Sequence, residues 1–255
     1  MSNMNPKRRK HRRRRRLNPR FVGLVCAVAA LLTGVILWIV LADRTPDEQG
    51  TATGAFVPMG TIKIEDLQDA DSGSYRGLEV TKIGSYTGIF VEDGSDGPVA
   101  RILMVIVKNT GKQTVQYAQV ELSDGNTVAQ FTLSTLPPGE SMVLLETTRM
   151  SYDAGKNLDQ VTIKNVAVFP QEPESREDQL KIQALDGALN VTNISGKDIT
   201  GDVVIYYKNA SSDMLYGGIT YRVTIKGGIK AGEIKQVSAA HYTAKGSRVM
   251  WIAVE

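Results

Sequence analysis

The sequence predicts a mainly β protein, in which a single N-terminal transmembrane helix precedes two tandem β-sandwich domains. Three observations lead to this fold class. An uncharged apolar segment long enough to cross a membrane follows a strongly basic tail. From residue 60 onward, short apolar runs alternate with turn residues, as in sandwich proteins. One pattern of strands and turns occurs twice, so we expect two domains of the same kind.

Basic residues crowd the first 20 positions, whereas the rest of the chain is acidic. The chain has 30 Lys and Arg against 27 Asp and Glu, a net charge of +3. Ten of the basic residues and no acid lie in residues 1–20, which leaves 20 basic against 27 acidic residues, or about −7, in the remainder. The ten are Lys7, Arg8, Arg9, Lys10, Arg12, Arg13, Arg14, Arg15, Arg16 and Arg20. We expect a cytoplasmic tail that sets the topology and binds anionic lipid headgroups.

Nucleic-acid binding by this tail is not expected, because no aromatic residue is interleaved with its basic run for base stacking.

Residues 21–42 are predicted to cross the membrane as one helix of roughly 33 Å, which matches a hydrocarbon core of about 30 Å. The basic flank places the N-terminus in the cytoplasm and the C-terminus outside the cell membrane. Phe21 and Trp38 are expected at the two membrane interfaces. A signal peptide cleaved after Ala42 is the alternative.

Residues 43–59 are rich in Thr, Gly, Pro and acidic residues, which predicts a flexible stalk. The first sandwich is expected at residues 60–169. Its continuous apolar run at 101–107 predicts a central strand that is buried on both faces. The pair Asp124 and Gly125 predicts a tight turn between two strands.

Residues 170–178 contain two prolines and several acidic residues, which predicts a linker between domains. The second sandwich is expected at residues 179–255. It begins with a hairpin that turns at Asp186-Gly187, and the apolar run at 203–207 predicts its central strand. Near the C-terminus, alternation predicts that Trp251 points inward.

A pattern of turns occurs in both halves of the body. The sequence Val-Lys-Asn109-Thr-Gly and the later Pro-Gly139-Glu are echoed by Val-Thr-Asn193-Ile-Ser-Gly and the later Ala-Gly232-Glu. The two asparagines are 84 residues apart and the two glycines are 93 residues apart. These spacings are the size of a domain and too long for a solenoid repeat. We therefore expect two copies of one fold.

The turn Val-Thr-Asn-Ile-Ser-Gly-Lys after Asn190, the strand Val-Val-Ile-Tyr-Tyr-Lys-Asn at 203–209 and the later Ala-Gly-Glu turn resemble FxLYD and related immunoglobulin-like modules of bacterial envelope proteins. The resemblance covers roughly residues 178–255 and extends to 99–169. Tyr206 stands where the family has leucine. The resemblance implies surface-held immunoglobulin-like β-sandwiches without catalytic activity, and it transfers no binding residues.

Candidates for chemistry are few. One cysteine and two histidines exclude a disulfide framework and a histidine-built metal centre. His241 lacks a nearby G-x-S-x-G nucleophile turn and an evident orienting acid. The acidic turn that begins at Asp69 resembles the start of a calcium loop, but Val80 occupies the position of the liganding glutamate. The acidic turn at 92–97 is a similar cluster. We expect no enzyme activity, no cofactor and no metal.

The expected function is that of a membrane-anchored envelope protein whose extracytoplasmic part binds another protein or a wall polymer, or acts as a scaffold. The alternative is an accessory subunit or sensor, in which binding outside the membrane acts through the basic tail, and an unrecognised hydrolase is a third. A lysine-to-asparagine crosslink was considered for Lys108, Asn109 and Lys164. The candidate aromatic residues for a binding face are Tyr75, Tyr86, Phe90, Tyr152, Tyr216 and Tyr242.

Overall fold

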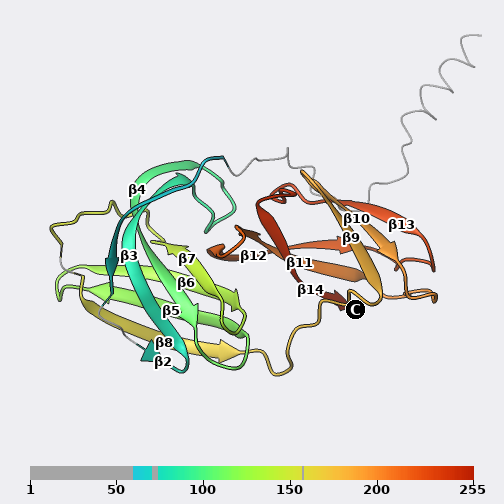
Figure 1. Ribbon diagram of the computed structural model, residues 1–255, viewed down its shortest axis with the longest axis horizontal. Coiled ribbons are helices and arrows are strands. Elements are labelled where there is room, and N and C mark those ends of the chain that lie inside the picture. Colours follow the sequence, from blue (N-terminus) through green and yellow to red (C-terminus); the bar gives the residue numbers. More distant parts are fainter. Residues whose placement is uncertain (1–59, 71–73, 157) are drawn as a thin grey trace, which may run out of the picture. The chain divides into compact units, whose positions relative to one another are not determined.

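The computed structural model of the protein describes residues 60–70, 74–156 and 158–255 (Figure 1). Within them it is mainly β, with fourteen strands and no α-helix. No helix that could span a membrane is found in the described part of the chain. The predicted tail, membrane helix and stalk at residues 1–59 lie outside it. Every described residue belongs to one compact unit.

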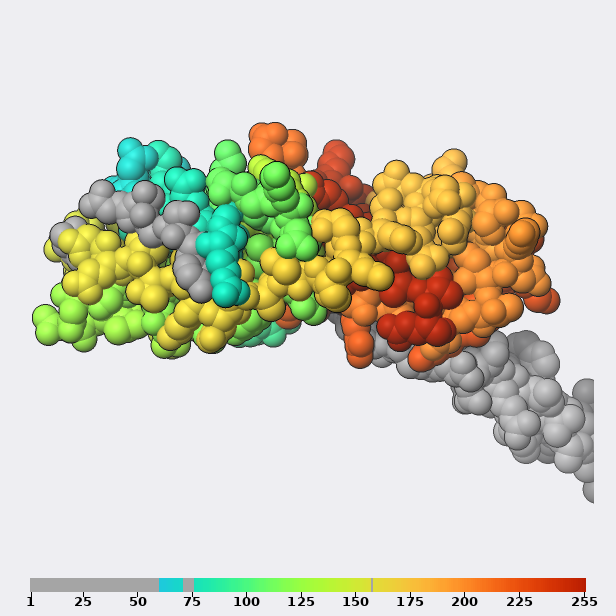
Figure 2. All heavy atoms as spheres, turned by 90° about the horizontal axis from the view of Figure 1, so that it is seen from below, coloured from blue at the N-terminus to red at the C-terminus, as the bar shows by residue number. Residues whose placement is uncertain are grey.

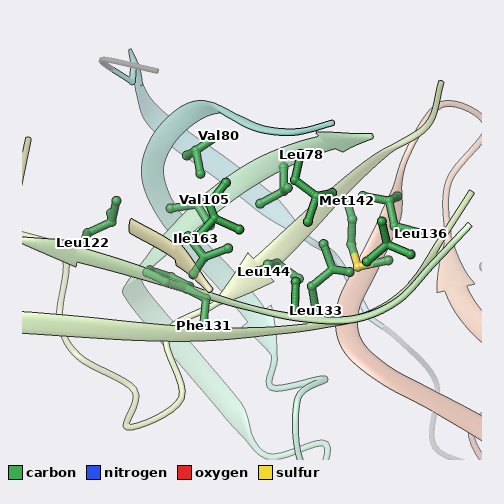
Figure 3. Packing of buried hydrophobic residues seen from close by; sticks show 14 of the residues in the cluster. Leu78, Val80, Val105, Leu122, Phe131, Leu133, Leu136, Met142, Leu144 and Ile163 are labelled. Carbon is green, nitrogen blue, oxygen red and sulfur yellow. The ribbon is translucent and has the colours of Figure 1, made fainter. Parts of the chain in front are cut away.

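Residues 60–169, called the first half below, form two sheets that face each other. In one, β1, β3, β4 and β7 are neighbours, with β2 paired to β3, and in the other the order is β6, β5, β8. Buried side chains from both sheets, such as Val105, Phe131 and Leu144, point toward one another between them (Figure 3). The strands are β1 (Lys63–Asp69), β2 (Ser74–Tyr75), β3 (Leu78–Ile89), β4 (Pro98–Asn109), β5 (Val115–Ser123), β6 (Val128–Leu136), β7 (Ser141–Leu145) and β8 (Gln160–Val168).

Residues 179–255, called the second half below, also form two layers. One has the order β13, β10, β9 and the other the order β12, β11, β14. Their shared core includes Val191, Ile205 and Ile252. The strands are β9 (Leu180–Leu185), β10 (Ala188–Asn193), β11 (Val203–Ala210), β12 (Leu215–Ile225), β13 (Ile234–Ser238) and β14 (Ser247–Val254).

Several local predictions are confirmed. The run at 101–107 lies in β4 and is buried on both faces, since Val105 belongs to the core between the sheets and Met104 to a separate cluster on the other face. The Asp124 turn joins β5 to β6, and the Asp186 turn joins β9 to β10. The apolar run at 203–207 lies in β11, the middle strand of its sheet.

The two halves have the same strand pairing. The set β3-β4-β7 of the first half corresponds to β9-β10-β13 of the second, and β6-β5-β8 corresponds to β12-β11-β14. Counted along the chain from β3 and from β9, the first, second and fifth strands of each half form one sheet, and the third, fourth and sixth strands form the other. The repeated turns of the sequence therefore mark equivalent points of equivalent strands.

The repeated asparagines show why these turns recur. Asn109 and Asn193 are fully buried. The Asn109 amide donates to the carbonyl oxygens of Gln113 (2.9 Å) and Leu136 (2.8 Å). The Asn193 amide donates to the corresponding carbonyl oxygens, those of Lys197 (2.7 Å) and Ile229 (2.8 Å).

The backbone around each asparagine repeats as well. Gly139 donates its N–H to the carbonyl of Asn109, and Gly232 does so to the carbonyl of Asn193, at 2.8 and 3.0 Å. Each asparagine thus ties the turn after its strand to the Gly-Glu turn some thirty to forty residues later, and satisfies carbonyl groups that burial would otherwise leave unpaired.

Replacing Asn193 by alanine should lower the free energy of unfolding by about 1–3 kcal/mol, because the buried carbonyl of Ile229 and the partly buried carbonyl of Lys197 lose their donor. Denaturant-induced unfolding measures the change. Asn190, on the same strand, is the matched control, since its side chain bonds to other side chains at the exposed surface. Equal losses in Asn193→Ala and Asn190→Ala would contradict a structural role for the repeated asparagine.

The predicted linker at 170–178 forms no strand but is hydrogen-bonded to both halves. The Thr114 N–H donates to the Glu172 carboxylate at 3.2 Å, and the Ile252 N–H donates to the Glu174 carbonyl at 2.9 Å. Figure 2 shows this segment, in yellow to gold, against the red C-terminal strand. That the two halves fold separately stays a prediction.

The two halves are joined more directly by one sheet. Strand β7 pairs in parallel with β12 through Leu215 opposite Met142 and Tyr216 opposite Val143. The sheet β1-β3-β4-β7 therefore continues into β12-β11-β14, which gives a path of seven strands with β2 at its side. The two strands that pair, β7 and β12, belong to different layers of the repeated unit, so the continuous sheet joins two layers that are not equivalent.

Candidate functional site

The start of β12 is packed tightly against the first half. Leu215 belongs to the buried core of the first half although it is part of the second. Gly217 has φ +80°, and a Cβ there would lie 2.8 Å from Val91 Cγ2. A Cβ on Gly218 would lie 1.8 Å from the carbonyl oxygen of Thr132 in β6. Only glycine fits at these two positions, so the sequence Gly-Gly in β12 defines how closely the halves approach.

Glu92 extends the hydrogen bonding of the β7–β12 pair by a side chain. Its Oε1 accepts the backbone N–H of Leu145 at 2.8 Å, and its Oε2 accepts that of Gly218 at 2.6 Å. Leu145 ends β7 and Gly218 lies in β12, just beyond their last backbone pair. One carboxylate therefore bridges the two strands where they diverge.

A buried lysine lies in the same junction. Lys208 of β11 is fully buried, and its Nζ donates to the carbonyl oxygens of Gly217 (3.0 Å) and Ile219 (2.5 Å) and to Ser134 Oγ (3.4 Å). Burial lowers the pKa of Lys208 to about 7, against the opposing effect of the Glu92 charge. Burial likewise raises the pKa of Glu92 to about 7, although the two N–H donors and Lys208 oppose the shift.

A second contact between the halves involves His241. Its Nδ1 lies 2.5 Å from Oδ2 of Asp96, whose side chain is 3% exposed, and its ring stacks on Tyr221 at 4.6 Å between centroids. The expectation that His241 has no orienting acid is wrong. Asp96 was missed because 145 residues separate the pair along the chain. The contact ties the loop between β3 and β4 to the loop between β13 and β14.

An open groove of about 650 Å³ lies beside this junction. The outer face of β12, β11 and β14 forms one side, and β5 and β6 form the other. Tyr206 and Trp251, neighbours across β11 and β14, stack with centroids 4.0 Å apart and planes at 7°. Phe169 meets Trp251 edge-on at 5.4 Å. The lining residues are Glu92, Gln116, Tyr117, Thr132, Ser134, Thr135, Phe169, Tyr206, Gly218, Ile219, Thr220 and Trp251.

A second hollow of about 660 Å³ adjoins the groove. It shares Phe169 and Trp251 with the groove and is otherwise lined by the linker and the end of β14, including Glu172, Glu174 and Arg176. The two rings thus stand between two hollows. Together the groove and this hollow, called the junction groove below, follow the boundary between the halves.

The aromatic residues predicted for a binding face are mostly elsewhere. Tyr86, Phe90 and Tyr242 are buried core residues. Tyr152 and Tyr216 are partly buried and pack against core clusters. The Tyr75 side chain lies outside the described part.

The sequence pattern also failed to identify the rings of the groove. It predicted Trp251 to point inward, yet Trp251 lies on the outer face of its sheet. A register shift between Tyr206 and Tyr207 in the β11–β14 pairing accounts for this, because one extra residue reverses which side chains face the core.

The acidic candidates separate in the structure. Asp69 pairs with Lys82, Asp93 pairs with Arg149, and Glu92 and Asp96 make the junction contacts described above. Asp71 lies outside the described residues. Within the described ranges, no group of three His, Cys, Asp or Glu is placed to hold a metal ion.

The residues considered for a lysine-to-asparagine crosslink also have other partners. The Asn109 amide is bonded to two backbone carbonyls, as described above. Lys164 pairs with Glu121 at 2.5 Å, and Lys108 is exposed. The ten basic residues of the tail, Phe21 and Trp38 lie outside the described part of the chain.

Comparison with protein-family models finds no match, and comparison with curated proteins finds no significant relative. The junction groove is therefore defined by geometry alone.

Proposed function

We propose that the protein is a membrane-anchored binding protein of the cell envelope, whose two tandem immunoglobulin-like β-sandwiches associate with another envelope component outside the membrane. The observation that carries the proposal is the junction groove, an open surface lined in part by aromatic rings. It lies between two halves that are held together by the β7–β12 pairing and the Glu92 hydrogen bonds. The identical strand pairing of the halves supports the immunoglobulin-like assignment. The basic tail and the apolar segment at 21–42 support a single-pass anchor with a cytoplasmic N-terminus.

Association fits the groove better than catalysis. The carboxylate of Glu92 already accepts two backbone N–H groups, so it is committed to the junction. Thr220 Oγ1 is bonded to Thr135 Oγ1 and lies 2.9 Å from Ser134 Oγ. Four aromatic rings, those of Tyr117, Phe169, Tyr206 and Trp251, stand in the rest of the lining and supply contact area for a ligand.

The proposal predicts that crosslinking of intact cells will capture an envelope component on the described part of the chain. A membrane-impermeant crosslinker is applied to cells that carry the full chain with a C-terminal tag, and the captured species are analysed by mass spectrometry. We expect a recurrent protein or wall fragment, attached within residues 60–255. Recovery of the uncrosslinked chain alone would contradict the proposal.

A chimera separates the proposal from the sensor alternative. The body is fused to an unrelated membrane anchor with a cytoplasmic N-terminus, and the crosslinking is repeated. We expect the same partner. If the chimera reaches the surface and folds but loses every partner, the tail or helix mediates the function, and the accessory-subunit or sensor function replaces the scaffold.

A further inference from the structure

We propose that the junction groove is a binding site for a chain of uncharged sugars. This inference rests on the proposed function and specifies its ligand class. A sugar ring has faces rich in C–H groups, which pack on aromatic rings, and an edge of hydroxyl groups, which need hydrogen-bond partners. A site for such a ligand needs rings and neutral polar groups side by side.

The groove presents both kinds of group. Tyr117, Phe169, Tyr206 and Trp251 are each partly exposed and line one continuous surface. A contiguous group of exposed apolar side chains marks an interaction site, whereas a single exposed ring is common on protein surfaces. Here four rings come from four separate parts of the chain.

Neutral polar groups stand beside the rings. Gln116 on β5 is exposed, and its amide offers two donors and an acceptor. Thr132 on β6 and the Tyr117 hydroxyl add further groups that both donate and accept. These groups suit sugar hydroxyls, which also act in both ways.

Charge disfavours an anionic polymer. The carboxylates of Glu172 and Glu174 line the second hollow, and its one guanidinium, that of Arg176, lies 3.7 Å from the Glu174 carboxylate and is bonded to the Ile252 carbonyl and to Gln179. Two carboxylates against one guanidinium leave the hollow with a net negative charge. A phosphate-rich polymer or a nucleic acid would meet like charge there. The acidic character of the whole chain beyond the tail acts in the same direction.

The backbone disfavours an extended peptide. A peptide that adds to a sheet needs an open strand edge. Two edge strands border this groove, β6 and β14, and both are partly covered. On β6, Thr147 donates its N–H to the Gln130 carbonyl and Gly218 packs on the Thr132 carbonyl. On β14, Ile252 donates its N–H to the Glu174 carbonyl. The ligand must therefore bind through side chains.

The two hollows indicate a chain rather than a single sugar. Each has a volume in the range of a pocket for a drug-sized molecule, and they meet at Phe169 and Trp251. A linear oligosaccharide that crosses these rings can occupy both hollows at once.

The test is a titration of the full-length protein in detergent with chitohexaose and, separately, cellohexaose. The chain has two tryptophans, Trp38 and Trp251, so a fluorescence change that is lost in Trp251→Phe reports on the groove. Isothermal titration calorimetry gives the affinity. We expect saturable binding of at least one of these sugars, weakened about tenfold or more in Trp251→Ala, about 1.4 kcal/mol.

Two further variants keep the test decisive. Gln116→Ala changes an exposed side chain and should weaken binding several-fold without affecting folding. Ile234→Ala, which alters a residue of β13 that is 64% exposed, should leave binding unchanged. Absence of binding by the folded wild type, or equal binding by wild type and Gln116→Ala, would overturn the inference.

Failure of this inference differs from failure of the proposed function. If neither sugar binds but cell crosslinking still recovers a protein partner, the sugar assignment is wrong and the binding function stands. Saturable binding of a polyphosphate chain or an unstructured peptide in the groove, without sugar binding, would also reject it. If both experiments recover nothing, both proposals fail.

Discussion

Replacing Gly218 by alanine should lower the melting temperature of the protein by about 6–12 °C. The added Cβ would lie 1.8 Å from the Thr132 carbonyl oxygen and 2.8 Å from Glu92 Oε2. Neither neighbour can yield, because the first is backbone and the second is bonded to Gly218 itself. Steric changes of this severity cost about 3 kcal/mol or more, and each kcal/mol shifts the melting temperature by about 2–4 °C in a body of this size.

Gly97→Ala is the matched control for this substitution. A Cβ at Gly97 would meet only the Ser95 hydroxyl, at 3.8 Å, so its melting temperature should stay within about 2 °C of wild type. Both variants are compared by calorimetry. If Gly218→Ala melts like Gly97→Ala, β12 does not pack on β6 as described.

Replacing Glu92 by alanine should cost about 2–4 kcal/mol of stability, because the backbone N–H groups of Leu145 and Gly218 lose their acceptor. The substitution also removes the carboxylate whose charge acts on the buried Lys208. Denaturant unfolding measures the loss. Adding Lys208→Met removes the isolated ammonium group, so the double variant should be no less stable than Glu92→Ala alone. A double variant that loses the sum of the two single effects would show that the residues act independently.

The same pair predicts a dependence on pH. The pKa of Glu92 is raised from 4.5 to about 7, so its contribution to stability is full below pH 4.5 and falls as the pH rises toward 7. The pKa of Lys208 is lowered from 10.5 to about 7, so its contribution is present above pH 10.5 and falls as the pH drops toward 7. The stability difference between wild type and the double variant should therefore be lowest near neutral pH.

The parts of the fold that follow from local pattern could be predicted from the sequence. Alternation and turn residues located most strands, and a run of apolar residues identified β4 and β11 as central. The repeated Asn109 and Asn193 turns indicated two copies of one unit. Each copy needs a buried amide at the end of the same strand, so an asparagine recurs at the same position of the unit.

The junction could not be predicted in this way. Glu92 and Gly218 are 126 residues apart, and Asp96 and His241 are 145 apart. Nothing local marks such partners. The groove rings were missed for another reason, since the register shift beside Tyr206 reverses the alternation on which the inward direction of Trp251 was based.

The pairing of β7 with β12 joins unlike edges of two like units, a heterologous contact, and a contact of that kind can be repeated from one unit to the next. The edge equivalent to β7 in the second half belongs to β13. At the 93-residue spacing, Lys235 and Gln236 stand there in place of Met142 and Val143, which face β12 in the first half. A lysine on an edge strand opposes pairing with another chain. The edge that joins the two units is therefore not repeated at β13, where a lysine disfavours the addition of a further strand.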